Sequence, residues 1–125
     1  MAIIDVLDLL TDALNELDGI EFARDAWEDK APDQYGVVEM TQSPRIIYAD
    51  GKPLDAVYTA RVTLYIIGDD DTWAAKVTEK VLSLEDDHEW LDVSCRLTLH
   101  QFQFDIGKVQ WEFTVQISAP LVREG

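Results

Sequence analysis

The stretch DAVYTARVTLYII, residues 55–67, alternates between two sets of side chains over its whole length. Alternation with a period of two is typical of a β-strand, because successive side chains of a strand point to opposite faces of the sheet. A strand of this length is long for a globular domain, and it predicts an element that reaches beyond the domain edge. One face of the predicted strand carries Ala56, Tyr58, Ala60, Val62, Leu64 and Ile66.

The residues before this strand predict a protruding β-hairpin arm over about residues 43–56. YGVVEMT, residues 35–41, is a strand-like run, and Asp50 with Gly51 marks a turn between two further extended segments. A two-stranded hairpin gains little stability in water when nothing covers its apolar side chains. Docking on a neighbouring molecule is therefore favoured over packing back on the sheet. The residues expected at a subunit interface are Arg45, Ile46, Ile47, Tyr48, Asp50, Gly51, Lys52 and Leu54 of the arm, with Trp27 and Trp90 from charged loops.

Apolar residues at intervals of three and four predict two amphipathic helices. The first starts at about Ile3 and ends before Gly19, and a short strand follows at residues 20–22. The second starts near Asp70 or Asp71, where an aspartate side chain can cap the free amides of the first turn. The apolar stripe of the first helix is Ile3, Val6, Leu7, Leu10, Ala13, Leu14 and Leu17, and that of the second is Trp73, Ala74, Val77, Val81 and Leu84.

Residues 94–105 and 109–117 predict the two strands of a closing hairpin, with the turn at Ile106, Gly107 and Lys108. The last strand alternates without interruption, which is typical of a sheet with one buried and one solvated face. Its inward set is Val109, Trp111, Phe113, Val115 and Ile117, and its outward set is Gln110, Glu112, Thr114 and Gln116.

The phase of the first of these two strands changes between Leu99 and Phe102. A β-bulge near His100 and Gln101 would account for the change. The alternative is that both faces are covered at this end, so that Phe102 and Phe104 meet a helix or a neighbouring subunit.

The 125 residues fit one α+β domain, with a mainly antiparallel sheet, two amphipathic helices packed on it and the protruding arm. Cys95 has no cysteine to pair with, which predicts a reducing compartment and a thiol that behaves as a small apolar group. Asp5, Asp8 and Asp12 interrupt the apolar start of the chain, which excludes a signal peptide and a membrane span. We expect a soluble, intracellular protein with no membrane partner.

The net charge of −15 is concentrated in two segments. Residues 1–34 carry −8 and residues 68–92 carry −7, whereas the rest of the chain sums to zero. This balance disfavours tight binding to DNA phosphates, which requires lysine and arginine. The charge serves either to keep the protein soluble or to form a functional surface. The acidic surface predicted from the helices comprises Asp5, Asp8, Asp12, Glu16, Asp69, Asp70 and Asp71.

The chain offers no convincing catalytic or metal motif, so we expect no enzyme activity, no cofactor and no metal. His88 lies among acidic residues, but adjacent loop residues seldom converge on one ion. The acids at residues 69–71 lack the alternation of a calcium loop, and helix capping explains them better. Cys95 and His100 are five residues apart on a strand, which places them on opposite faces unless a bulge intervenes.

The chain resembles the small tail completion or tail terminator proteins of long-tailed bacteriophages over nearly its whole length. The matching segments are PDQYGVVEMT, IIYADGKPLDAVYTARVTLYII, DTWAAKVTEKVLSL and FQFDIGKVQWEFTVQI. The resemblance implies a small α+β subunit of a homo-oligomeric ring, six-membered in that family. Such a ring binds the last ring of the tail tube protein, stops tube growth and presents the surface for head attachment through a head-completion or neck protein. It also implies a location in the virion tail, and in the host cytoplasm during assembly, with DNA passing through and no specific binding.

Two other functions fit the same residues. A head-closure or other neck connector protein would share the ring and the phage context, but it would occupy a different level of the connector. An acidic DNA mimic that inhibits a host protein would use its carboxylates to bind a basic partner, with a steep dependence on salt.

Overall fold

The computed structural model describes residues 6–27 and 30–120, and the long strand β4 (Lys52–Ile66) is its centre. β4 pairs along one edge with β2 (Tyr35–Met40) and then β3 (Arg45–Ala49), and along its other edge with β6 (Lys108–Pro120). All three of these pairings are antiparallel. The predicted long strand is therefore confirmed, and it extends further toward the N-terminus than the sequence pattern indicated.

The sheet is completed by two outer strands. β5 (Asp92–Gln103) pairs antiparallel with the free edge of β6, and β1 (Glu21–Arg24) runs parallel to β2. The main path of the six-stranded sheet follows the order β1-β2-β4-β6-β5, with β3 paired to β4 beside it. This mainly antiparallel sheet with its helices confirms the predicted single α+β domain.

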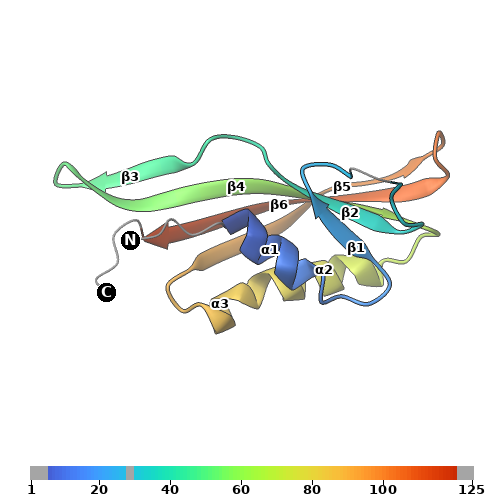
Figure 1. Cartoon of the computed structure of the whole chain (residues 1–125), viewed down its shortest axis with the longest axis horizontal. Helices are drawn as coiled ribbons and strands as arrows, with labels where there is room; N and C mark the ends of the chain where they lie inside the picture. The colour runs from blue at the N-terminus through green and yellow to red at the C-terminus, as the bar shows by residue number, and fades with distance from the viewer. Residues whose placement is uncertain (1–5, 28–29, 121–125) are drawn as a thin grey trace.

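Three helices lie against one face of the sheet (Figure 1). They are α1 (Val6–Leu14), α2 (Thr72–Leu82) and the single turn α3 (Leu84–Asp87). α2 buries Trp73, Val77 and Val81 of its predicted apolar stripe, whereas Ala74 is half-buried and Leu84 is buried in α3. The predicted alternation of β6 is also confirmed, since all five inward side chains are buried. The core thus forms between the helices and the inward face of β4 and β6.

The first helix ends earlier than predicted, and its predicted start cannot be compared. Ile3, where it was expected to start, lies outside the described residues, and α1 ends at Leu14 instead of continuing to Leu17. After Leu14 the backbone tightens, because the amides of Glu16 and Leu17 donate to carbonyls three residues back, at 3.1 Å each. The side chain of Asn15 bonds the backbone of β1 at this point. Its amide donates to the Phe22 carbonyl at 3.1 Å, and its oxygen accepts from the Phe22 amide at 2.7 Å. These two bonds fasten the end of the helix to the edge strand.

Two further predictions need correction. The acidic residues before His88 were expected to belong to a charged loop, but Leu84–Asp87 forms the helical turn α3. The predicted bulge in β5 exists, but it lies between Leu97 and Leu99 rather than near His100 and Gln101. From the bulge onward the strand changes phase, so that His100 and Phe102 lie opposite Trp111 and Val109 on the helix-covered face. Because the bulge precedes Leu99, that residue lies opposite Glu112, on the face of the sheet that the helices do not cover.

The predicted arm is present as the hairpin of β3 with the start of β4. Asp50 and Gly51 form its turn with φ angles of 52° and 76°, a pair of left-handed residues that suits the right-handed twist of a hairpin. The arm projects at one end of the molecule, and the turn between β5 and β6 projects at the opposite end (Figure 1).

Candidate assembly interface

The arm exposes apolar side chains on both of its faces. Every residue of β3 is exposed, and Tyr48 and Leu54 are 62% and 51% exposed. Ile46 lies opposite Ala56 and Ile47 opposite Asp55 in the antiparallel pair, so the two isoleucines point to different faces. An apolar hairpin without a covering element is typical of a surface that binds another protein.

The arm is held at its base and extends freely at its tip. Asp55, Ala56 and Val57 of β4 pair with the last residues of β6, so the base of the arm belongs to the main sheet. The segment from Lys52 to Leu54 pairs only with β3 within the described part of the chain. The interface residues predicted from the sequence, Arg45, Ile46, Ile47, Tyr48, Asp50, Gly51, Lys52 and Leu54, are thus gathered on this one projection.

The opposite end of the molecule carries a second exposed apolar group, made of Phe102 and Phe104, which the sequence had singled out, and Ile106, which it had placed only in the turn. Phe104 is 88% exposed in the turn after β5, and Phe102 and Ile106 are each about half exposed. The rings of Phe102 and Phe104 meet edge to face at 4.9 Å between centroids. In the described part of the chain both rings remain open to solvent, so the phase change of β5 comes from the bulge and not from a helix that covers these rings. The sequence feature that indicates this exposed group is FQFDIG, residues 102–107, in which apolar side chains continue into the predicted turn.

The two predicted tryptophan anchors are half-buried on their own subunit. Trp27 donates its indole N–H to the Gly36 carbonyl at 3.2 Å and meets Tyr35 edge to face. Trp90 packs against the core and meets His88 edge to face at 5.4 Å. Both fasten loops to the domain, and their role at an interface stays a prediction.

Two of the acids predicted for the surface near α1, Asp8 and Glu16, take part in ion pairs. Asp8 contacts Arg24 at 2.8 Å, and Glu16 contacts Lys80 at 3.6 Å. Both pairs are solvent-exposed, and pairs of this kind add little to stability. The other acids predicted for this surface are Asp12, which is exposed, and Asp5, which lies outside the described residues.

The acids at residues 69–71 organise the start of α2. Asp69 pairs with His100 Nε2 at 2.8 Å, which ties the loop to β5. Asp70 accepts hydrogen bonds from the hydroxyl and the amide of Thr72, at 2.6 and 3.1 Å, and these bonds lower the pKa of its carboxyl group. Asp71 occupies the N-cap position without a capping bond of its side chain. The predicted capping by an aspartate is thus carried out by Asp70.

Cys95 and His100 do not form a catalytic pair. The bulge brings both to the helix-covered face, but they lie opposite Val115 and Trp111 on β6. Four residues of strand separate those positions, on the order of 13 Å. Burial raises the pKa of the Cys95 thiol, only partly offset by a hydrogen bond with Thr78, so the thiol is held in its unreactive protonated form.

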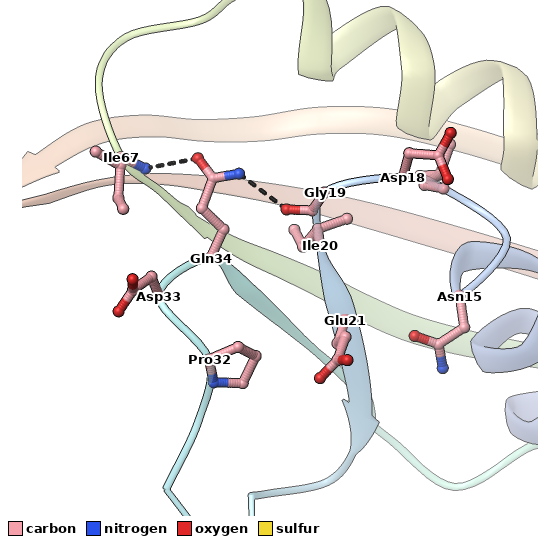
Figure 2. A pocket seen from close by; sticks show the side chains of 10 residues that line it. Asn15, Asp18, Gly19, Ile20, Glu21, Pro32, Asp33, Gln34 and Ile67 are labelled. Atoms are coloured by element: carbon pink, nitrogen blue, oxygen red, sulfur yellow. Dashed lines mark hydrogen bonds between the residues drawn. The ribbon is translucent and has the colours of Figure 1, made fainter.

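An open hollow of about 640 Å³ lies between the loop after α1, the start of β1 and the end of β4. Gln34 spans it, donating to the Gly19 carbonyl at 2.9 Å and accepting from the Ile67 amide at 3.1 Å (Figure 2). The carboxylates of Asp18, Glu21 and Asp33 point away from one another in this hollow (Figure 2). Within the described residues, no group of three or more His, Cys, Asp or Glu side chains is arranged to hold a metal ion.

Comparison with known proteins does not assign the chain to a family. A scan against models of protein families finds no match to the chain, and a search of curated proteins finds no relative of significant similarity. Within the described residues, no helix combines the length and apolar character needed to cross a membrane.

Proposed function

We propose that this protein is the subunit of a ring that ends the tail tube of a long-tailed bacteriophage, stops tube growth and provides the surface to which the head attaches. The observation that carries the proposal is the projecting β3–β4 arm with its exposed Ile46, Ile47, Tyr48 and Leu54. A closed ring needs an interface in which one patch meets a different patch on the next copy, and a projecting apolar arm suits that geometry. The resemblance of the sequence to tail terminator proteins supports the same function.

The charge distribution is compatible with DNA passing through such a ring. The protein carries 25 acidic residues against 10 basic ones, and the acids at α1 and before α2 lie on the helix-covered side of the sheet. A surface of this sign repels DNA phosphates and leaves the DNA free to slide. The partners in this proposal are further copies of the chain, the tail tube protein and a head-completion or neck protein.

The test is imaging of tails assembled in a host that lacks the gene for this chain. The proposal predicts tubes of uncontrolled length without heads, because nothing stops their growth, and restoration of normal tails when the gene is supplied. Tails of normal length that remain separate from heads would refute termination and assign the protein to the neck. Normal, head-bearing tails would refute both assembly functions.

A further inference from the structure

Two exposed apolar surfaces lie at opposite ends of the molecule. The first is the exposed hairpin of residues 45–54, which begins beside the base of the arm and includes its turn, and which we call the arm tip. The second, the end surface, consists of Phe102, Phe104 and Ile106 together with the acidic loop at residues 69–71 and Asp105. Figure 1 shows the arm at one end of the long axis and the β5–β6 turn at the other. Each surface has apolar side chains that no element of the same subunit covers in the described structure.

The end surface is held together by contacts around His100. The imidazole of His100 stacks on the Trp111 ring at 3.8 Å between centroids, with 12° between the planes. The same imidazole contacts Asp69 at 2.8 Å, so the acidic loop before α2 is fastened to β5 two residues from Phe102. The apolar side chains and the carboxylates therefore form one surface rather than two separate ones.

The charges of the two surfaces are opposite. Residues 45–54 carry two bases, Arg45 and Lys52, and one acid, which gives +1 in a protein whose net charge is −15. Residues 69–71 and 102–108 carry four acids and one base, Lys108, which gives −3. Opposite charges around two apolar surfaces favour their association and disfavour the contact of either surface with a copy of itself.

We propose that the arm tip of one copy binds the end surface of the next copy, with the apolar side chains of the arm against Phe102, Phe104 and Ile106. The contact is heterologous, since a surface at one end of a copy meets a different surface at the opposite end of its neighbour, and repetition of such a contact generates a ring or a filament. This inference rests on the proposed ring and names the two surfaces that join its subunits.

Disulfide trapping tests the contact directly. Ala49→Cys and Asp105→Cys place one thiol beside the arm turn and one in the end surface, at exposed positions, in a Cys95→Ser background. We expect the oxidised double variant, concentrated in solution or bound to purified tails, to give a ladder of covalent species above the dimer. Each single variant should give dimers at most. The control pair, Ala49→Cys with Glu79→Cys on the exposed side of α2, should give no ladder.

The outcomes decide between geometries. A double variant that stops at the dimer would show a closed pair of copies and overturn the head-to-tail contact. A ladder from the control pair equal to that from the test pair would show random collision and overturn it as well. No covalent species above the monomer, both in solution and on tails, would place the contact elsewhere.

Charge reversal gives a second, independent readout. Lys52→Glu on the arm and Asp105→Lys on the end surface should each weaken association of the subunits by about two- to fivefold, as expected for exposed charges. The double reversal should restore it, because opposite charges again face each other. A double variant that associates no better than either single variant would overturn the proposal.

Failure of this inference is distinguishable from failure of the proposed function. Overgrown tails in the absence of the gene, combined with no ladder from the test pair, would retain the terminator function and reject the contact. A ladder combined with normal tails in the absence of the gene would retain the contact and reject the function.

Discussion

Gly36 of β2 lies opposite Phe22 of β1 in the parallel pair, and the ring of Phe22 occupies the space above it. A Cβ on residue 36 would overlap that ring and lie 3.1 Å from the Thr63 carbonyl oxygen. Phe22 is buried and its backbone is bonded on both sides by Asn15, so the ring cannot move away without loss. A single residue without a side chain thus allows the first strand to join the sheet.

Gly36→Ala should therefore destabilise the protein by about 1–3 kcal/mol, the usual cost of overpacking a filled site. Urea denaturation of wild type and variant measures the difference. The double variant Gly36→Ala with Phe22→Leu should be less destabilised than the sum of its two single changes, because the smaller side chain makes room for the new methyl group. Equal stability of Gly36→Ala and wild type would contradict the packing described.

The thiol of Cys95 is predicted to react slowly in the folded protein. Burial raises its pKa, so the folded state keeps the proton to higher pH than the unfolded chain does. The stability that comes from burying the neutral thiol is present below the pKa of an unfolded cysteine and is lost as pH rises through the folded pKa. Cys95→Ala should therefore reduce the loss of stability above about pH 8.5.

Labelling in the folded and in the unfolded state checks the predicted slow reaction of the Cys95 thiol. Labelling with a thiol reagent at pH 8 should be several times slower for the folded protein than for glutathione, and it should become fast in denaturing urea. Fast labelling of the folded protein would show that the thiol is accessible and contradict the burial.

At the level of the secondary-structure elements, the arm is a projection whose apolar side chains are exposed and lie outside the core of the domain. β3 is exposed throughout, and its turn residues are already suited to a tight hairpin. The main sheet continues beneath the arm through the pairing of β4 with β6. Loss of apolar side chains from the arm tip should thus leave the domain folded.

The double change Ile47→Ser with Tyr48→Ser should alter the free energy of unfolding by less than about 1 kcal/mol, as is usual for exposed positions. It should abolish rescue of normal tails in a host that lacks the gene. Leu82→Ser is the matched control, because Leu82 is exposed to the same degree as Ile47, 40% against 39%, but lies on α2. Failure of both variants to rescue, or success of both, would show that the arm has no special role.

At the scale of the whole molecule, the net charge of −15 opposes folding through repulsion among carboxylates. The ion pairs of Asp8 and Glu16 are exposed and offset little of this repulsion. The folded protein concentrates the acids more than the unfolded chain does, so screening by salt favours the folded state.

The melting temperature should therefore rise as sodium chloride is increased from about 20 mM to about 200 mM, because the Debye length falls to less than 10 Å. A parallel series with sucrose at equal osmolality separates screening from a general solute effect. A melting temperature that falls with salt would mean that attractive pairs outweigh the repulsion.

Much of the fold follows from local pattern, whereas the misplaced bulge in β5 arises from a contact between separate strands. The long strand, the arm with its turn at Asp50 and Gly51, and the apolar stripe of α2 all depend on residues close together in the chain. The bulge in β5 was misplaced because alternation shows that a phase changes but not which residue is left unpaired. That residue is chosen by the pairing of β5 with β6, a contact between separate strands.

The class of the fold, the concentration of acids in the helical segments and the existence of an apolar hairpin arm could be predicted from local pattern, because periodicity, turn residues and charge are local properties. The positions of these features relative to one another are visible only in the folded molecule. The tertiary structure places the exposed Phe102, Phe104 and Ile106 at the end opposite the arm and fastens the acidic loop beside them through His100. Such placement depends on strand order and register, which arise from contacts between residues far apart in the chain.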